Sequence, residues 1–266
     1  MSYQDIFKRY EMKYMVTKEQ KEVLLRKMAE YMKPDEYGRS TICNIYFDTA
    51  DYELIRHSLD KPVYKEKLRV RSYGPARQDG TVFVELKKKY KGVVYKRRVS
   101  AGWQEAMDYL TKGRALPRQS QITEEISYFK QMYKGLKPAV YLSYDREAFY
   151  GIDDRELRIT FDQNILWRKE DLSLCAEVYG TPILQEGCSL MEVKISDAMP
   201  MWLCRVLSDN GIFKTSFSKY GRAYEMICEQ QENLGMGMVM IPGQPSAERE
   251  LLGQGRKKIG HRTQIA

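Results

Sequence analysis

Hydrophobic and polar residues alternate along much of the chain, and stretches with helical spacing interrupt the alternation. Side chains two apart share a face of a strand, so the alternation predicts half-buried strands. The predicted strands are Ile6–Val16, Thr41–Asp48, Lys65–Tyr73, Thr81–Lys89, Val93–Ser100, Pro138–Tyr150, Glu156–Trp167 and Ser189–Ile195. The predicted helices are Lys18–Met32, Tyr52–Ser58, Trp103–Lys112, Thr123–Tyr133, Met201–Asn210 and Tyr220–Gln231.

Turn residues and composition predict how these elements are organised. Gln78-Asp79-Gly80 and Tyr90-Lys91-Gly92 each indicate a hairpin between neighbouring antiparallel strands. The chain shows no internal repeat, so we expect one α+β domain over residues 1–231. From about Glu232 the composition shifts to Gly, Met, Pro, Ser and Gln, which predicts a flexible tail over residues 232–266.

The polar faces of the predicted strands carry mostly charged residues. Lys67, Arg69 and Arg71 share one face of their strand, opposite Leu68 and Val70. The same alternation groups Arg9 with Glu11 and Lys13, Glu85 with Lys87, Lys96 with Arg98, Arg158 with Asp162, and Glu192 with Lys194. Few Thr, Ser or Gln residues stand among them.

This pattern has two interpretations. The first is an ordinary antiparallel sheet with one solvated face. The other is a closed antiparallel barrel whose charged face turns inward and forms a tunnel. Neighbouring cations repel each other by about 1 kcal/mol at ~4 Å in water, and more where water is excluded, which favours a polyanion between them. In the tunnel, Lys and Arg match phosphate oxygens, while Glu11, Glu85, Glu192 and Asp162 offer oxygens to a divalent cation.

Composition narrows the chemistry further. The 266 residues include 44 Lys and Arg against 36 Asp and Glu, a net charge of +8, which favours a polyanionic partner. Hydrophobic residues make up 43% of the chain, too many for a disordered basic protein. With only two His residues, a His-rich metal site or a Ser-His-Asp triad is disfavoured, and carboxylates that suit Mn²⁺ or Mg²⁺ are expected instead.

The five cysteines stand singly, and no stretch approaches the ~18–20 apolar residues of a membrane span. We therefore expect reduced cysteines and a cytoplasmic protein.

Several stretches, taken in order, resemble one known family. They are RYEMKY, NIYFDT, LRVRSYG, VFVELKKK, YKRRV, YDREAF, RITFD, MEVKI and FSKYGRA, spread from about Ile6 to Gln231. In this respect the chain is similar to the catalytic domain of the vacuolar transporter chaperone (VTC) family, within the CYTH-like triphosphate tunnel metalloenzyme superfamily. The resemblance implies a tunnel that transfers the terminal phosphate of ATP to inorganic polyphosphate, with Mn²⁺ or Mg²⁺ as cofactor.

The resemblance also implies roles for particular residues. The expected catalytic cations are Lys13, Arg69, Arg71, Lys87, Arg146 and Lys219. The expected phosphate-binding residues are Lys96, Arg98, Arg158, Lys194, Ser218 and Tyr220, and the expected metal ligands are Glu192, Glu85 and Glu11. ATP and polyphosphate are the expected partners, and any membrane or regulatory partner is expected to be a separate protein.

One departure from the superfamily pattern bears on the reaction. Hydrolytic members begin with E-x-E-x-K, whereas Arg9 stands here in place of the first Glu. One fewer carboxylate and one more cation favour transfer to phosphate over hydrolysis. Two alternatives stay open: a tunnel triphosphatase, and a non-catalytic binder of polyphosphate or nucleic acid. Nucleic acid is disfavoured because sheets that bind it pair exposed cations with exposed aromatics.

Overall fold

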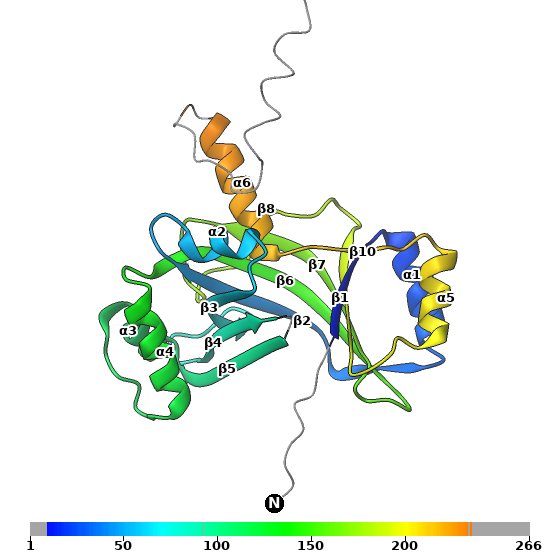
Figure 1. Cartoon of the computed structure of the whole chain (residues 1–266), viewed down its shortest axis with the longest axis horizontal. Coiled ribbons are helices and arrows are strands. Elements are labelled where there is room, and N and C mark those ends of the chain that lie inside the picture. Colours follow the sequence, from blue (N-terminus) through cyan, green and yellow to red (C-terminus); the bar gives the residue numbers. More distant parts are fainter. Residues whose placement is uncertain (1–9, 92, 234, 236–266) are drawn as a thin grey trace, which may run out of the picture.

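A computed structural model describes residues 10–91, 93–233 and 235 of the chain. Figure 1 shows a large sheet with helices around it. The strands are β1 (Tyr10–Val16), β2 (Met32–Asp48), β3 (Tyr64–Tyr73), β4 (Thr81–Tyr90), β5 (Val93–Gly102), β6 (Lys137–Gly151), β7 (Arg158–Arg168), β8 (Thr181–Pro182), β9 (Ser189–Ile195) and β10 (Lys214–Thr215). The helices are α1 (Lys18–Met28), α2 (Glu53–Leu59), α3 (Trp103–Lys112), α4 (Gln121–Met132), α5 (Met201–Asp209) and α6 (Lys219–Asn233).

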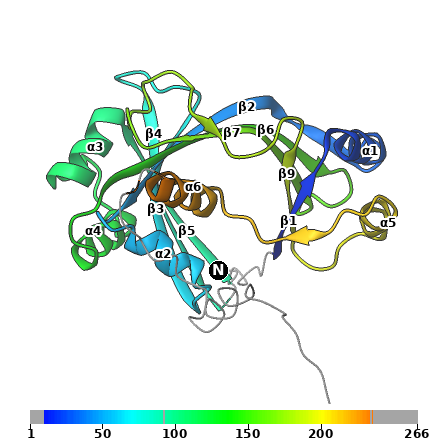
Figure 2. The same cartoon turned by 90° about the horizontal axis from the view of Figure 1, so that it is seen from above.

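The strands form one antiparallel sheet in the order β10-β1-β9-β7-β6-β2-β3-β4-β5, with β8 added beside β7. This confirms the predicted α+β class. Within the described residues, hydrogen bonds do not close the sheet between β5 and β10, so the barrel is open along that seam. Register shifts interrupt the β2–β6 and β6–β7 pairs, and such bulges increase the bend and twist of long strands. Figure 2 shows the resulting trough, with α6 on its concave side.

Three apolar clusters hold the helices against the sheet. On one outer flank α3 and α4 cover the apolar side chains of β3 and β4, and on the other flank α1 and α5 cover those of β1, β7 and β9 (Figure 2). The third cluster lies on the concave side, where Tyr220 and Tyr224 of α6 pack against Tyr46, Leu142 and residues near them. The apolar strand faces are therefore covered, and the remaining concave surface belongs to the charged residues.

The predicted elements are present; α3 and β9 have the predicted ends, and other elements have shifted ends. The first helix ends at Met28, four residues before its predicted end, and β2 begins at Met32, nine residues before its predicted start. Pairing with the long strand β6 holds this early part of β2 in the sheet, although it contains Pro34 and Gly38. The two-residue strands β8 and β10 were not predicted, because so short a segment carries no periodicity.

The described residues contain no helix long and apolar enough to cross a membrane. All five cysteines are free thiols. Most of the predicted tail lies outside the described residues, as do Arg9 and the Gly92 of the second predicted hairpin. The strands that this hairpin was predicted to join, β4 and β5, are paired from Tyr90 and Val93 onward.

Candidate active site

One cavity of about 130 Å³ collects the charged side chains of the concave face. It is lined from β1, β2, β3, β4, β5, β6 and β9 and from the beginning of α6. The lining residues are Glu11, Lys13, Tyr46, Lys67, Arg69, Arg71, Lys87, Lys96, Tyr144, Arg146, Glu192, Lys194, Ser218, Lys219 and Tyr220. The alternating charges in the sequence therefore meet in one place, because the curved sheet turns these strand faces toward each other.

On one side of the cavity, acids and bases neutralise each other. The register places Lys13 opposite Glu192 and Glu11 opposite Lys194 across the β1–β9 pair. On β6 and β7, Arg146 stands opposite Asp162. Opposite charges paired across strands stabilise a sheet. We call the set of Glu11, Lys13, Arg146, Asp162, Glu192 and Lys194 the acid-rich wall.

Glu192 is the centre of the acid-rich wall. Its carboxylate lies 3.6 Å from Lys13 Nζ and 3.4 Å from both Arg146 Nη2 and Lys219 Nζ. Burial alone would raise the pKa of Glu192, but the charges of Lys219, Lys13 and Arg146 hold it well below its usual range. The carboxylate is therefore ionised and faces the cavity.

Asp162 supports this arrangement from behind. Its side chain is fully buried, and its two oxygens accept hydrogen bonds from Arg146 Nε at 2.6 Å and Arg146 Nη2 at 2.7 Å. Lys219 Nζ forms a further short ion pair with Asp162. Bidentate pairs of this kind fix the plane of a guanidinium, so Asp162 orients Arg146 and Lys219 toward the cavity.

The opposite side of the cavity carries cations without acids. Lys67 stands opposite Lys87 across the β3–β4 pair, and Lys87 stands opposite Lys96 across the β4–β5 pair. We call these three residues the lysine row. Within the described part of the chain, no carboxylate lies within ion-pair distance of any of them, although the charge of Glu11 acts on Lys87 and Lys96 from the acid-rich wall. Like charges directly opposite each other destabilise a sheet, so this row needs an external anion to neutralise it.

The local electrostatics reflect the missing counter-charge. Desolvation, followed by the charges of Lys87 and Lys13, lowers the pKa of Lys67 to about 7. Desolvation together with the charges of Lys194 and Lys87 lowers the pKa of Lys96 to about 8. An anion that enters the cavity would stabilise the charged form of each lysine and return these pKa values toward their usual range.

Beside the lysine row, Glu85 holds a group of arginines. Its Oε2 accepts from Arg69 Nε at 2.8 Å and lies 3.7 Å from Arg71 Nε, while its Oε1 accepts from Arg98 Nε at 2.7 Å. Burial opposes ionisation, yet these arginine charges lower the pKa of Glu85 to about 2. The oxygens of Glu85 are therefore occupied by guanidinium groups, and we interpret Glu85 as a residue that positions arginines.

Helix α6 begins directly at the cavity. Ser218 Oγ accepts the backbone N–H of Gly221, which caps the helix, and also accepts Lys67 Nζ at 3.0 Å. Lys13 Nζ donates to the carbonyl of Phe217 at 2.9 Å. Tyr220 is anchored by its hydroxyl, which donates to the buried Asp48. The positive end of the helix dipole thus adds to an already cationic cavity.

The structure brings together all but three of the predicted site residues. Glu85 and Arg98 lie beside the cavity in the arginine group, and Arg158 is exposed near its edge, opposite Lys194. Three lining residues were absent from the prediction: Lys67, Tyr46 and Tyr144. The alternation already placed Lys67 on the face of Arg69. The two tyrosines gave no charge signal, although their hydroxyls accept hydrogen bonds from Arg69 and Arg71.

The donor set for a metal is sparse. Among the described residues, no three His, Cys, Asp or Glu side chains come together as a metal site. Glu192 and Glu11 both lie within 4 Å of Lys13 Nζ, at 3.6 Å and 3.9 Å. Mg²⁺ in phosphate-binding proteins is often held by one or two carboxylates and completed by the substrate's own oxygens. Glu192 and Glu11 fit that kind of site, whereas Glu85 does not because arginines occupy its oxygens.

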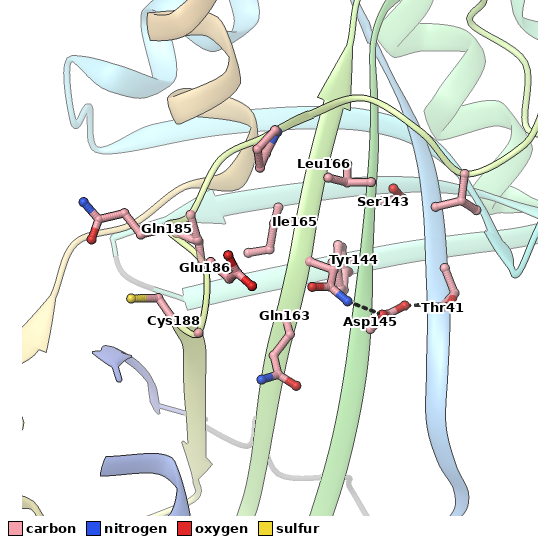
Figure 3. A pocket seen from close by; sticks show the side chains of 15 residues that line it. Thr41, Ser143, Tyr144, Asp145, Gln163, Ile165, Leu166, Gln185, Glu186 and Cys188 are labelled. Carbon is pink, nitrogen blue, oxygen red and sulfur yellow. Dashed lines mark hydrogen bonds between the residues drawn. The ribbon is translucent and has the colours of Figure 1, made fainter. Parts of the chain in front are cut away.

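A second and larger cavity, of about 520 Å³, lies between β2, β6, β7 and the segment around β8. Figure 3 shows Thr41, Asp145 and Gln163 on the strand side, and Glu186 and Cys188 on the opposite side. No Lys or Arg lines it. Its charged lining residues are the acids Asp145 and Glu186, so it suits a polyanion less well than the first cavity does, and size alone does not identify the active site.

Three solved structures are similar to this chain to different degrees. A candidate adenylyl cyclase from Hippeastrum, described as having a dominant triphosphatase activity, superposes with a TM-score of 0.51 at 15% identity, covering 87% of this chain and 98% of its own. A candidate adenylate cyclase from Bacillus halodurans gives 0.43 at 16% identity, covering 91% of this chain and 96% of its own. A candidate adenylate cyclase from Vibrio parahaemolyticus gives a TM-score of 0.44 at 12% identity, covering 81% of this chain and 97% of its own. No curated protein matches the chain.

The Hippeastrum structure shares the fold of this chain, and in this chain that fold encloses the charged concave cavity. The VTC domain matches residues 8–228, almost the whole of the described chain. The protein belongs to the VTC domain family.

Proposed function

We propose that the charged cavity is the active site of a polyphosphate polymerase, which transfers the terminal phosphate of ATP onto inorganic polyphosphate. The observation that carries this proposal is the lysine row: three cations in register without an acid, facing a wall in which acids and bases are balanced. A polyanion with evenly spaced charges neutralises such a row. Membership of the VTC domain family supports the same reaction.

The residues divide the chemistry between them. Lysines and arginines of the cavity hold two phosphate groups in line, so that an oxygen of the acceptor chain attacks the terminal phosphorus of ATP while the bond to ADP breaks. No covalent enzyme nucleophile is required. Arg146 and Lys219, fixed by Asp162, lie ready to stabilise the charge that develops on the transferred group.

A divalent cation, Mn²⁺ or Mg²⁺, belongs to this proposal. Glu192 and Glu11 would hold it together with phosphate oxygens. When bound, such an ion supplies Lewis-acid polarisation of the phosphoryl oxygens. Because Lys13 touches both carboxylates, it would keep them in place and balance their charge.

A tunnel triphosphatase is the second candidate, favoured by the activity described for the Hippeastrum protein. The cations that hold a phosphate chain serve either reaction, so the two differ in the acceptor. Water needs less positioning than a second phosphate chain. The lysine row therefore favours the polymerase, because its three cations extend the cationic surface beyond the arginine group and the acid-rich wall.

The deciding experiment incubates the purified protein with ATP labelled at the terminal phosphate and with Mn²⁺ or Mg²⁺. The label is then measured in polymer and in free phosphate over time, with and without a short polyphosphate primer. We expect label in polymer and a shorter initial lag with primer. Release of free phosphate alone, with or without primer, would replace the polymerase by the triphosphatase. Binding without turnover would leave a polyphosphate-binding module.

A further inference from the structure

A growing polyphosphate chain must leave the cavity, and the inner faces of β3 and β4 carry cations beyond it. Two residues further along each strand from the lysine row, Lys65 stands opposite Lys89. Side chains two apart share a face, so this second pair lies on the same face as Lys67 and Lys87 and about 7 Å away. Neither residue is among those that line the cavity.

The second pair resembles the lysine row in its lack of acids. Lys65 is half-buried and Lys89 is exposed, and within the described chain neither forms an ion pair with a carboxylate. Lys65 Nζ donates to the carbonyl of Ser58 at 3.1 Å, which fixes its position beside the last turn of α2. The acid of this segment, Glu66, is on the opposite strand face, where it pairs with Lys88.

Further cations lie close enough to Lys65 to affect its pKa. Desolvation, then the charges of Lys89, Lys87 and Lys61, lowers the pKa of Lys65. Lys61, in the connection between α2 and β3, is exposed. Cations therefore continue from the cavity, past the beginning of β3 and the end of β4, to the exposed Lys61, whose neighbour in the chain is the exposed acid Asp60.

The edge of the cavity near Arg158 differs. There Arg158 and Lys194 stand beside Glu11 and Glu192, so cations and acids alternate. A polyanion is attracted to a run of cations and repelled by each acid along its path. The two ends are thus electrostatically unequal.

We infer that Lys65 and Lys89, with Lys61 beyond them, form an exit track that binds the part of a polyphosphate chain already outside the cavity. This inference rests on the proposed function, because it takes polyphosphate as the ligand. It assigns a direction: the finished part of the polyphosphate chain leaves past the beginning of β3 and the end of β4. The track adds affinity only for chains long enough to reach it, since a chain too short to leave the cavity makes no contact there.

The test compares two probes, tripolyphosphate and long-chain polyphosphate, by equilibrium binding to the full chain without ATP. For the double variant Lys65→Gln/Lys89→Gln we expect about a fivefold loss of affinity for the long chain and little change for tripolyphosphate. Two charge contacts of ordinary strength, one half-buried and one exposed, account for a loss of that size. The control variant is Lys18→Gln/Lys134→Gln, which removes the same charge from two exposed lysines outside the cavity lining.

Three results would overturn the exit track: an equal loss for both probes, an equal loss in the control variant, or no loss at all. A length-dependent loss in Arg158→Gln instead would place the exit at the other end. Polymer synthesis is measured separately on the wild-type protein. A protein that binds long chains along the track but makes none would refute the polymerase and leave the track standing.

Discussion

The two sides of the charged cavity are built from the same residue types and differ in register. On the acid-rich wall, each base faces an acid on the next strand, as Lys13 faces Glu192. In the lysine row, Lys67, Lys87 and Lys96 face one another. Alternation within a strand decides which residues turn inward, but pairing between strands decides whether their charges cancel. The lysine row is therefore the part of the cavity whose charges are not paired with carboxylates of the protein.

The difference has an energetic meaning. The acid-rich wall stabilises the sheet by itself, because its charges are paired and partly buried. The lysine row opposes folding and is tolerated because packing elsewhere holds β3, β4 and β5 together, through the apolar faces that α3 and α4 cover. Stored repulsion of this kind is typical of binding sites, where the ligand relieves it.

The largest effect is expected on the acid-rich wall. Glu192→Gln should reduce polymer synthesis by about 10³-fold, because it removes the anionic ligand proposed for the metal, while polyphosphate binding is retained. Initial rates at saturating Mn²⁺ and equilibrium binding measure the two effects. Glu186→Gln is the matched control, since it removes an acid from the second cavity. Unchanged turnover in Glu192→Gln would show that the acid-rich wall takes no part in phosphate transfer.

Lys219 should show the next largest effect. Lys219→Ala removes a cation that contacts both Asp162 and Glu192, and we expect polymer formation to fall by about 10²-fold. Release of free phosphate should fall less, because water requires less positioning than a chain end. Labelled ATP distinguishes the two products. An equal loss of polymer formation and of free-phosphate release would show that Lys219 acts on a step that the two reactions share.

The lysine row predicts a specific pH dependence. The pKa values of Lys67 and Lys96, about 7 and about 8, lie below the ordinary lysine value of 10.5, so the unfolded chain binds more protons than the folded one above about pH 7. Through these groups the ligand-free protein becomes more stable as the pH rises from 7 toward 10. Tripolyphosphate affinity should fall over the same window, by about tenfold between pH 7 and pH 9, because bound phosphate needs charged lysines.

Thermal unfolding and equilibrium binding across this pH range measure both trends. Lys67→Arg is the control, since arginine keeps its charge throughout the range and should flatten the binding curve. A wild-type affinity that is independent of pH would contradict the assignment of low lysine pKa values to the cavity.

The smallest effect is expected for the C-terminal segment. Deletion of the residues after Glu232 should leave polymer synthesis within about twofold and the melting temperature within about 2 °C, because the composition of that segment argues against a core role. A large fall in melting temperature on truncation would show that the segment packs against the domain.

Much of this site could be predicted from the sequence, because strand alternation directly reports which side chains share a face. That pattern grouped Lys67 with Arg69 and Arg71, and Glu192 with Lys194. It could not show that Lys67, Lys87 and Lys96 stand side by side, since register depends on turns and bulges that periodicity does not reveal. Nor could it show that three guanidinium groups contact the oxygens of Glu85. For that reason the sequence places Glu85 among the expected metal ligands, whereas we interpret it as a residue that positions arginines.

The open seam between β5 and β10 illustrates the same limit for the fold. The inward charged faces imply a tunnel. Whether β5 and β10 form hydrogen bonds with each other depends on the sum of small bends in the strands between them. The register shifts between Pro34 and Arg39 and between Ser143 and Asp145 contribute to those bends, and the size of the bend at each cannot be derived from a single sequence.

The most direct test of the central claim, that the lysine row is kept for a polyanion, is thermal unfolding of Lys87→Gln with and without tripolyphosphate. We predict that the ligand-free variant melts about 2 °C or more above the wild type, because repulsion within the row is relieved, and that the ligand-induced rise falls by more than half. Lys88→Gln, on the opposite strand face where Lys88 pairs with Glu66, should melt lower and keep the full ligand-induced rise. A Lys87→Gln variant that melts below the wild type and responds fully to tripolyphosphate would contradict the account.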